Sequence, residues 1–330
     1  MNAKVLKHAF RIESPPQPAL LGDSPATAEL RRVVARAGPT DAGVLITGES
    51  GAGKEFVARL IHASSPRSQG PFVRLNCDVL PPGEIEAGLF GSEQTDVDGI
   101  RRVHAGALER AAGGSLFLDE IAGMPPQTQG RLLNAMDTGR YHRVGGSTEI
   151  SPDVRIIAAS TRCPMQLARQ GLLREDILYS LAVFLVQVPA LRERGADVIV
   201  LAEHFLEEMN AREARDKRFS ARSRDLMVTN EWPGNARELR SCIARAFALC
   251  DDLIELSPLI ARHDAGHDPG RLEIRVGSSI DQAERSLIEA TLQHFHGNKR
   301  RAADTLGCSL KTLYNKLHAY ARNESHVAGG

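Results

Sequence analysis

Residues 48–55 read GESGAGKE, and the fold is decided by this short stretch. It follows the apolar run VLIT at 44–47 and precedes a stretch with helical spacing at 55–63. Three glycines let the backbone turn so that successive N–H groups face one anion, and the lysine is placed to reach the β- and γ-phosphates of a nucleotide. A plain glycine-rich turn is the alternative interpretation. We predict a phosphate-binding loop made of Gly48, Glu49, Ser50, Gly51, Ala52, Gly53, Lys54 and Glu55.

An acidic pair ends a later apolar run, LFLDE at 116–120. Asp119, at the end of a buried strand, is placed to hold Mg²⁺, and Glu120 to polarise an attacking water as general base. Acids at a strand end are often helix caps. Together with the phosphate loop they favour catalysis. Position 55 is Glu, where Ser or Thr normally holds the metal, and this departs from the general motif.

The surrounding pattern predicts an α/β fold with a parallel sheet and helices on both faces. Buried strands are expected at 44–47, 72–76, 115–119, 154–160 and 184–188, crossover helices at 55–63 and 127–137, and a hairpin at 140–150. After residue 197 the spacing becomes helical and strand signals disappear. The predicted divisions are a tail at 1–19, an α/β subdomain at 20–190, a helical lid at 191–262, a linker at 263–279, a helix-turn-helix at 280–322 and a tail at 323–330.

Bulk composition limits the function classes. Lys plus Arg and Asp plus Glu are both 41, so net charge favours no partner, although residues 296–322 are locally basic. The five cysteines are scattered, odd in number and without a CxxC pair, which is typical of reduced thiols and argues against metal or redox chemistry. No signal peptide or bilayer-length apolar run is present, so we expect a cytoplasmic protein with no membrane partner.

A series of motifs then resembles one family. RLNC (74–77), LFG (89–91), GGSLFLDEI (113–121), RVGG (143–146), DVRIIAAS (153–160), PALRER (189–194) and WPGNARELR (232–240) follow the phosphate loop in order. Together they resemble the AAA+ domain of bacterial enhancer-binding proteins, which activate sigma-54 RNA polymerase. The resemblance covers residues 20–262. Glu55 is normal in that family, which removes the objection to the loop.

The resemblance implies roles for four further positions. Asn76 is similar to a residue that hydrogen-bonds the catalytic Glu and switches it with nucleotide state. Thr161 stands where a polar residue senses the γ-phosphate, and Arg237 resembles the sensor arginine of the lid. Arg174 resembles an arginine finger inserted into a neighbouring subunit of a hexamer, with a surface ion pair as its alternative. A second arginine usually follows six residues later, and here that position is Ser180.

The loop that touches sigma-54 in the family, GAFTGA at the tip of a helical insertion, is also altered here. The six corresponding positions are Thr95, Asp96, Val97, Asp98, Gly99 and Ile100. Val97 replaces the aromatic residue and Asp98 the threonine. Val buries less area than Phe, and two carboxylates must be desolvated at any contact. We expect poor coupling to sigma-54, through drift in a surface loop or retuning toward a partner with a basic face.

Residues 279–320 resemble the Fis-type helix-turn-helix. An amphipathic helix at 279–295 precedes a short helix at 300–306, a turn at Gly307 and a second helix capped by Ser309. Leu310, Leu313 and Leu317 are expected to face the core. The alternative is a dimerisation hairpin. Candidate DNA contacts are Lys311, Thr312, Asn315 and Lys316 in the major groove and Arg300 and Arg301 on phosphates.

We therefore expect a DNA-binding transcriptional regulator with a ring-forming AAA+ module that binds ATP and Mg²⁺ and hydrolyses ATP. Its expected partners are an inverted-repeat site in double-stranded DNA, RNA polymerase, and itself, as a dimer through the C-terminal domain and a hexamer through the AAA+ domain. One alternative is a sigma-54-independent regulator, acting at sigma-70 promoters or as a repressor, with the AAA+ module as a nucleotide-responsive scaffold. Another is a subunit of a mixed ring with a paralogue. A general AAA+ unfoldase or helicase loader is the least favoured. With no sensing domain ahead of residue 20, control is expected from expression level, a partner or a ligand.

Overall fold

Six strands form the central sheet in the order β1-β3-β6-β9-β2-β10. The computed structural model describes residues 10–12, 19–95, 101–256, 279–295, 299–313 and 315–317, in two units that divide after residue 256. Five strands are parallel and were predicted: β2 (Val44–Thr47), β3 (Phe72–Asn76), β6 (Ser115–Asp119), β9 (Arg155–Ser160) and β10 (Phe184–Gln187). The sixth, β1 (Phe10–Ile12), pairs antiparallel with β3 inside the segment expected to be only a tail.

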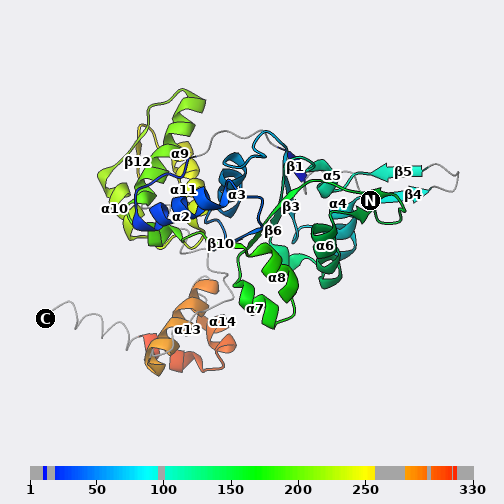
Figure 1. The fold of residues 1–330 in the computed structure, drawn as a ribbon. Coiled ribbons are helices and arrows are strands. Elements are labelled where there is room, and N and C mark those ends of the chain that lie inside the picture. Colours follow the sequence, from blue (N-terminus) through cyan, green and yellow to red (C-terminus); the bar gives the residue numbers. More distant parts are fainter. Residues whose placement is uncertain are drawn as a thin grey trace. The chain divides into compact units, whose positions relative to one another are not determined.

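Helices cover both faces of this sheet (Figure 1). Strand residues alternate between the faces: Val44 and Ile46 join the cluster with α2 (Pro25–Ala37) and α3 (Lys54–Ala63), and Leu45 joins the opposite cluster. That opposite cluster includes residues of α4 (Pro82–Phe90), α5 (Ala107–Arg110), α6 (Pro126–Thr138), α7 (Pro164–Arg169) and α8 (Glu175–Leu181). Each fully buried aliphatic side chain contributes roughly 1.5–3 kcal/mol, so the two clusters stabilise the sheet from both faces.

Two hairpins branch from the sheet domain. β4 (Ser92–Thr95) pairs antiparallel with β5 (Arg101–His104) and extends away from the sheet in Figure 1. The segments beside the altered loop are therefore strands, whereas the family resemblance implied a helical insertion. β7 (Tyr141–His142) and β8 (Glu149–Ile150) form the predicted second hairpin. Arg143, between β7 and β8, joins the two hairpins because its guanidinium binds Glu93 on β4, and it also binds Glu109 on α5.

The lid consists of α9 (Asp197–Glu213), α10 (Ala221–Thr229) and α11 (Asn235–Leu249), which follow the 3₁₀ turn η2 (Leu191–Arg194). Its apolar centre includes Trp232, whose indole N–H donates to the carbonyl of Met227 at 2.8 Å. β11 (Arg218–Phe219) and β12 (Leu253–Ile254) form a short parallel pair here. The prediction that strands are absent from this region was wrong, because two-residue strands are too short to show a periodic pattern.

The second unit contains α13 (Ile280–His294), α14 (Lys299–Thr305) and helical residues at 310–313 and 315–317. Its core is Ile288, Ala302, Ala303 and Leu313, with Leu317 packed against it. Leu310, expected in this core, is 41% exposed, and Leu287 on α13 is 45% exposed. Among the described helices, none combines the length and apolar character needed to cross a bilayer.

Candidate nucleotide and DNA sites

The phosphate loop joins β2 to α3, as the sequence predicts. Gly51 and Gly53 have φ of 75° and 107°, conformations that side chains other than glycine rarely adopt. Lys54 opens α3 and is buried, and its Nζ donates to the carbonyls of Gly48 at 3.0 Å and Glu49 at 3.3 Å. The ammonium is therefore folded onto its own loop, next to the N–H groups that a phosphate would meet.

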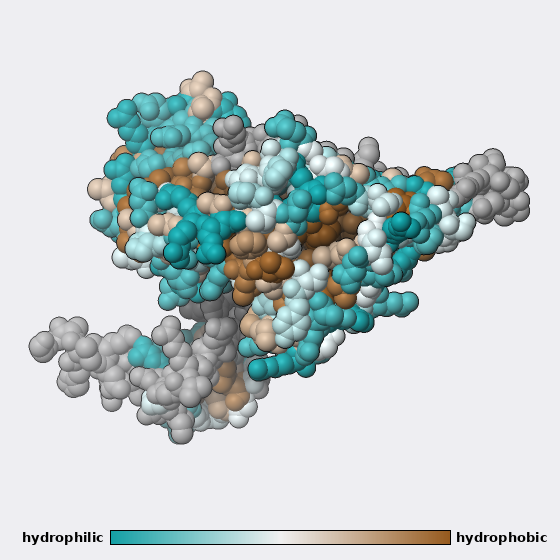
Figure 2. All heavy atoms as spheres, viewed as in Figure 1, coloured by the Kyte–Doolittle hydropathy of each residue, from teal (hydrophilic) through white to brown (hydrophobic). Residues whose placement is uncertain are grey.

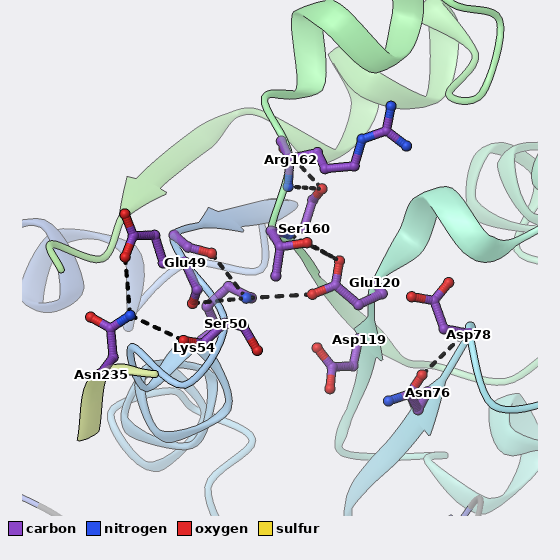
Figure 3. A network of polar contacts seen from close by, with 12 residues as sticks. Glu49, Ser50, Lys54, Asn76, Asp78, Asp119, Glu120, Ser160, Arg162 and Asn235 are labelled. Atoms are coloured by element: carbon purple, nitrogen blue, oxygen red, sulfur yellow. Dashed lines mark hydrogen bonds and ion pairs between the residues drawn. The ribbon is translucent and has the colours of Figure 1, made fainter. Parts of the chain in front are cut away.

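Asp119 ends β6 and Glu120 follows it, at the carboxyl edge of the sheet. Glu120 Oε1 lies 3.4 Å from Lys54 Nζ, and its Oε2 accepts the backbone N–H and hydroxyl of Thr161 at 2.9 and 3.0 Å (Figure 3). Glu120 also has φ of 52°, a strained conformation for a residue with a side chain. Parallel strands bring Lys54, Glu120 and Thr161 together from three separate elements, as ligand sites of open α/β sheets require.

Asn76 ends β3 directly opposite Asp119 in the strand register. Its Oδ1 accepts the backbone N–H of Asp78 at 2.9 Å, and Figure 3 shows the amide turned toward Asp78. The expected hydrogen bond to Glu120 is thus replaced in this structure by an Asx-type turn. Burial, followed by the charges of Glu120 and Asp119, raises the pKa of Asp78.

The lid closes over the loop through several polar contacts. Arg237 Nη1 donates to Ser50 Oγ at 3.2 Å, so the predicted sensor arginine does reach the phosphate loop. Asn235 Nδ2 donates to Glu49 Oε2 and to the Ser50 carbonyl, both at 3.1 Å. Arg192 donates from two nitrogens to the same Glu49 carboxylate. The hydrogen bond from Arg192, then that from Asn235, lowers the pKa of Glu49 from 4.5 to about 2.

Neither Asn235 nor Arg192 was predicted as a site residue. Asn235 is fully buried with φ of 54°, and its Oδ1 accepts the N–H of Leu191 at 2.8 Å. The Gly-Asn pair at 234–235 was an available signal, because asparagine tolerates the left-handed region. Arg192 has no local signal, since its partner lies 143 residues away.

The metal side of the site differs from the general motif. Glu55 binds Arg59 at 2.7 Å and Arg74 at 2.9 Å, and Arg74 also binds Asp119. Oxygen ligands suit Mg²⁺, so the Asp119 carboxylate fits this ion, but one of its oxygens already accepts from Arg74. Among the described residues, no cluster of three metal-binding side chains is found.

Arg174 lies at the surface, immediately before α8. It donates to Asp176 from Nε at 3.1 Å and Nη2 at 2.7 Å, and both side chains are 45% exposed. The chain alone therefore shows the surface ion pair, and a shallow hollow beside it is lined by Arg174, Glu175, Asp176 and Tyr179. Ser180 lies on the same helix, half-buried.

Of the six positions of the altered loop, the structure describes Thr95 alone. The other five positions lie outside the described residues: Asp96, Val97, Asp98, Gly99 and Ile100. Thr95 ends β4 and pairs with Arg101.

The predicted helix-turn-helix at 280–322, called the DNA reader below, keeps most of its expected local structure within the described residues. Gly307 has φ of 66°, and Ser309 Oγ accepts the N–H of Thr312 at 3.1 Å, as predicted for the turn and cap. Lys311, Thr312 and Asn315 are exposed. Lys316, expected on the DNA face, binds Glu284 on α13 at 2.6 Å and must leave that ion pair to reach DNA. Arg301 is exposed, and the side chain of Arg300 lies outside the described residues.

Three family models match the chain. Residues 20–187 match the "Sigma-54 interaction domain", residues 192–271 the "AAA+ ATPase lid domain", and residues 279–320 the "Bacterial regulatory protein, Fis family". These matches follow one another in the order of the sheet domain, lid and DNA reader described above.

Similar proteins agree with these models. The transcriptional regulatory protein FlbD of Caulobacter vibrioides is 37% identical over 90% of this chain and 69% of its own length. The transcriptional regulator NtrC of Azospirillum brasilense is 40% identical over 92% of this chain and 70% of its own length. Among solved structures, NtrX from Brucella abortus in complex with ADP is 34% identical, with a TM-score of 0.68 over 91% of this chain and 68% of that one.

Proposed function

The chain belongs to the family of sigma-54-dependent transcriptional regulators, and from this premise we propose that it binds and hydrolyses ATP in a ring while holding DNA through its second unit. The AAA+ sheet domain, the lid and the Fis-type reader supply one part each. The structure of NtrX with ADP supports nucleotide binding by a relative of the same fold.

The observation that carries this proposal is the contact of Lys54 and Thr161 with Glu120 at the carboxyl edge of the sheet. A phosphate bound in the loop competes with Glu120 for the Lys54 ammonium. Glu120 then loses its cation and keeps its hydrogen bonds from Thr161, which orient it as a base toward a water molecule. Phosphate binding thereby prepares the residue that activates the nucleophile.

Asp119 would hold Mg²⁺, which neutralises phosphate charge when bound. Ser50 Oγ and the Arg237 guanidinium are already 3.2 Å apart, so a γ-phosphate beside Ser50 would meet the lid arginine. Lid position and phosphate occupancy are coupled by this contact. The same chain segment, WPGNARELR, supplies Asn235 to the loop.

Assembly would complete the site. We assign Arg174 to a neighbouring subunit's nucleotide, where it exchanges Asp176 for phosphate oxygens. Tyr179, which lines the hollow beside Arg174, is 71% exposed, and Val183 and Leu185 further along the chain are 62% and 58% exposed, so apolar surface is available for self-association. On the face shown in Figure 2, hydrophobic residues gather near the middle and hydrophilic ones surround them. Ser180 in place of a second arginine predicts slow hydrolysis.

The second candidate function is a sigma-54-independent regulator, favoured by Val97 and Asp98 in the contact loop. Such a protein would use the AAA+ ring as a nucleotide-responsive scaffold. A mixed ring, in which a paralogue supplies the sigma-54 contact, explains the same loop.

The test uses the full chain with ADP–aluminium fluoride and labelled sigma-54, on a native gel beside a sizing column. A ring-sized complex containing sigma-54 supports the leading proposal. A ring that leaves sigma-54 free supports the second candidate, and a chain that forms no ring alone supports the mixed ring. Lys54→Ala is the control, because it removes the phosphate ligand.

A further inference from the structure

Arg74 forms ion pairs with two carboxylates, those of Glu55 and Asp119, on the side of the site where Mg²⁺ is expected. Its Nη1 lies 2.9 Å from Glu55 Oε2 at the start of α3, and its Nη2 binds Asp119 Oδ2 at the end of β6. The Arg74 side chain is 26% exposed and the Asp119 side chain 14%. Both ion pairs are therefore partly shielded from water. Charge interactions in such a partly buried place are stronger than at an open surface.

The strand register fixes this geometry. Arg74 and Asn76 are two residues apart on β3 and so share one face, and Asn76 is paired with Asp119. Phe72, two residues earlier on the same face, lies below the guanidinium of Arg59 from α3. The Nε of Arg74 is buried without a hydrogen-bond partner within the described residues, so its two terminal nitrogens make the polar contacts.

Bound nucleotide would affect the two cations at this edge of the sheet, Lys54 and Arg74, in different ways. Lys54 can replace its ion pair with Glu120 by contacts with phosphate oxygens. Arg74 lies on the side of Asp119, where a divalent ion would require the carboxylate for itself. If Asp119 binds the ion, Arg74 can still keep its ion pair with the Glu55 carboxylate.

We propose that Arg74 is a positioning residue that competes with Mg²⁺ for Asp119 and sets the Mg²⁺ concentration at which the site binds nucleotide. The inference rests on the proposed function, since it requires nucleotide to bind here. In the metal-free site Arg74 partly replaces the missing positive charge. When Mg²⁺ enters, Arg74 retains Glu55 and gives up Asp119.

The test measures binding of a fluorescent ATP analogue by the full chain across a Mg²⁺ titration. Arg74→Gln should lower the Mg²⁺ concentration for half-maximal binding by about tenfold, the change expected when one hydrogen bond between charged groups no longer competes for the carboxylate. In EDTA the same variant should bind the analogue more weakly, because the acids then lack a cation. A merely structural loss would weaken binding under both conditions.

Glu55→Gln gives a prediction of opposite sign. Without its second carboxylate, Arg74 should hold Asp119 more firmly, and the Mg²⁺ requirement should rise. This variant also decides the question if Arg74→Gln fails to fold by circular dichroism. The matched control is Arg67→Gln, because Arg67 likewise bridges two carboxylates, Asp41 at 2.8 Å and Asp153 at 2.6 Å. Its Mg²⁺ requirement should equal that of the wild type.

Two failures are distinguishable. If the wild-type chain binds no analogue at any Mg²⁺ concentration, the proposed function itself is wrong. If it binds and Arg74→Gln leaves the Mg²⁺ requirement unchanged or higher, competition by Arg74 is overturned. A lower requirement in Glu55→Gln overturns it as well.

Discussion

Gly51 shows how one residue joins the phosphate loop to the lid. Its φ is 75°, and a Cβ built on it would lie 2.2 Å from the carbonyl oxygen of Gly234. Gly51→Ala should lower the free energy of unfolding by about 1–3 kcal/mol, through backbone strain and the collision. It should also weaken nucleotide binding, because the lid must move away from the loop. Urea unfolding and analogue binding measure the two effects.

Gly171→Ala separates the two causes. Gly171 has φ of 70°, yet nothing lies within 4 Å of its added Cβ. This control should therefore show the conformational cost alone, with nucleotide binding unchanged. Equal losses in both variants would show that the approach of the lid to Gly51 has no energetic weight.

Individual site residues could be predicted from the sequence where their role follows from their position next to an apolar strand. Asp119 ends an apolar strand, Glu120 follows the same strand, and Lys54 follows another after a short loop; the structure places all three at one sheet edge. The left-handed backbone of Glu120 and the double contact of Arg74 could not be predicted. Both depend on neighbours that are distant in sequence, which a linear pattern does not report.

Among the elements, η2 and α11 hold the phosphate loop through Glu49. Arg192 and Asn235 lower the pKa of this carboxyl to about 2. A depressed pKa stabilises the fold at pH above the ordinary value of 4.5, and the contribution is lost only as pH falls toward 2. Arg192→Gln should move the pKa of Glu49 back toward its ordinary value, so that the carboxyl protonates at a higher pH than in the wild type.

This prediction is checked by urea unfolding of both proteins at pH 7, 5 and 4. The stability difference should stay below about 1 kcal/mol, because the Arg192 and Glu49 side chains are 42% and 43% exposed and solvent screens the pair. Lid opening, followed by a fluorophore on α11, should increase. Arg212→Gln, which loses an exposed pair with Glu213, is the control and should leave the lid unchanged. A lid insensitive to Arg192 would refute the coupling.

Long strands and helices were predictable because their periodic burial is long enough to read. The failures are short or depend on remote partners. β1 is three residues long and needs β3 as a partner, and the β4–β5 strands lie beside an acidic loop that hid their pattern. Leu310 follows the helical spacing yet is exposed, since the small core of the second unit is already filled by Ile288, Ala302, Ala303 and Leu313.

At the scale of the whole molecule, two units with separate cores carry separate chemistry. The sheet clusters lie before residue 256, and the core of the DNA reader lies between residues 288 and 313. Because each unit buries its own apolar side chains, damage to the phosphate loop should not alter the DNA-binding surface. The functions are then separable by single substitutions.

Without nucleotide, the full chain should bind a fluorescein-labelled random-sequence duplex with an affinity that falls as salt rises. Arg301→Ala, at an exposed position, should reduce the slope of log affinity against log salt by about 1, because it removes one phosphate contact. Lys311→Ala should reduce the slope less, because the exposed Lys311 is expected in the major groove and not on a phosphate. Lys54→Ala should keep the wild-type slope and lose binding of the ATP analogue. Fluorescence anisotropy at several salt concentrations measures all four proteins. A reduced slope in Lys54→Ala would mean that the AAA+ unit itself touches DNA, because removing a buried lysine of the phosphate loop leaves the reader's own cations in place.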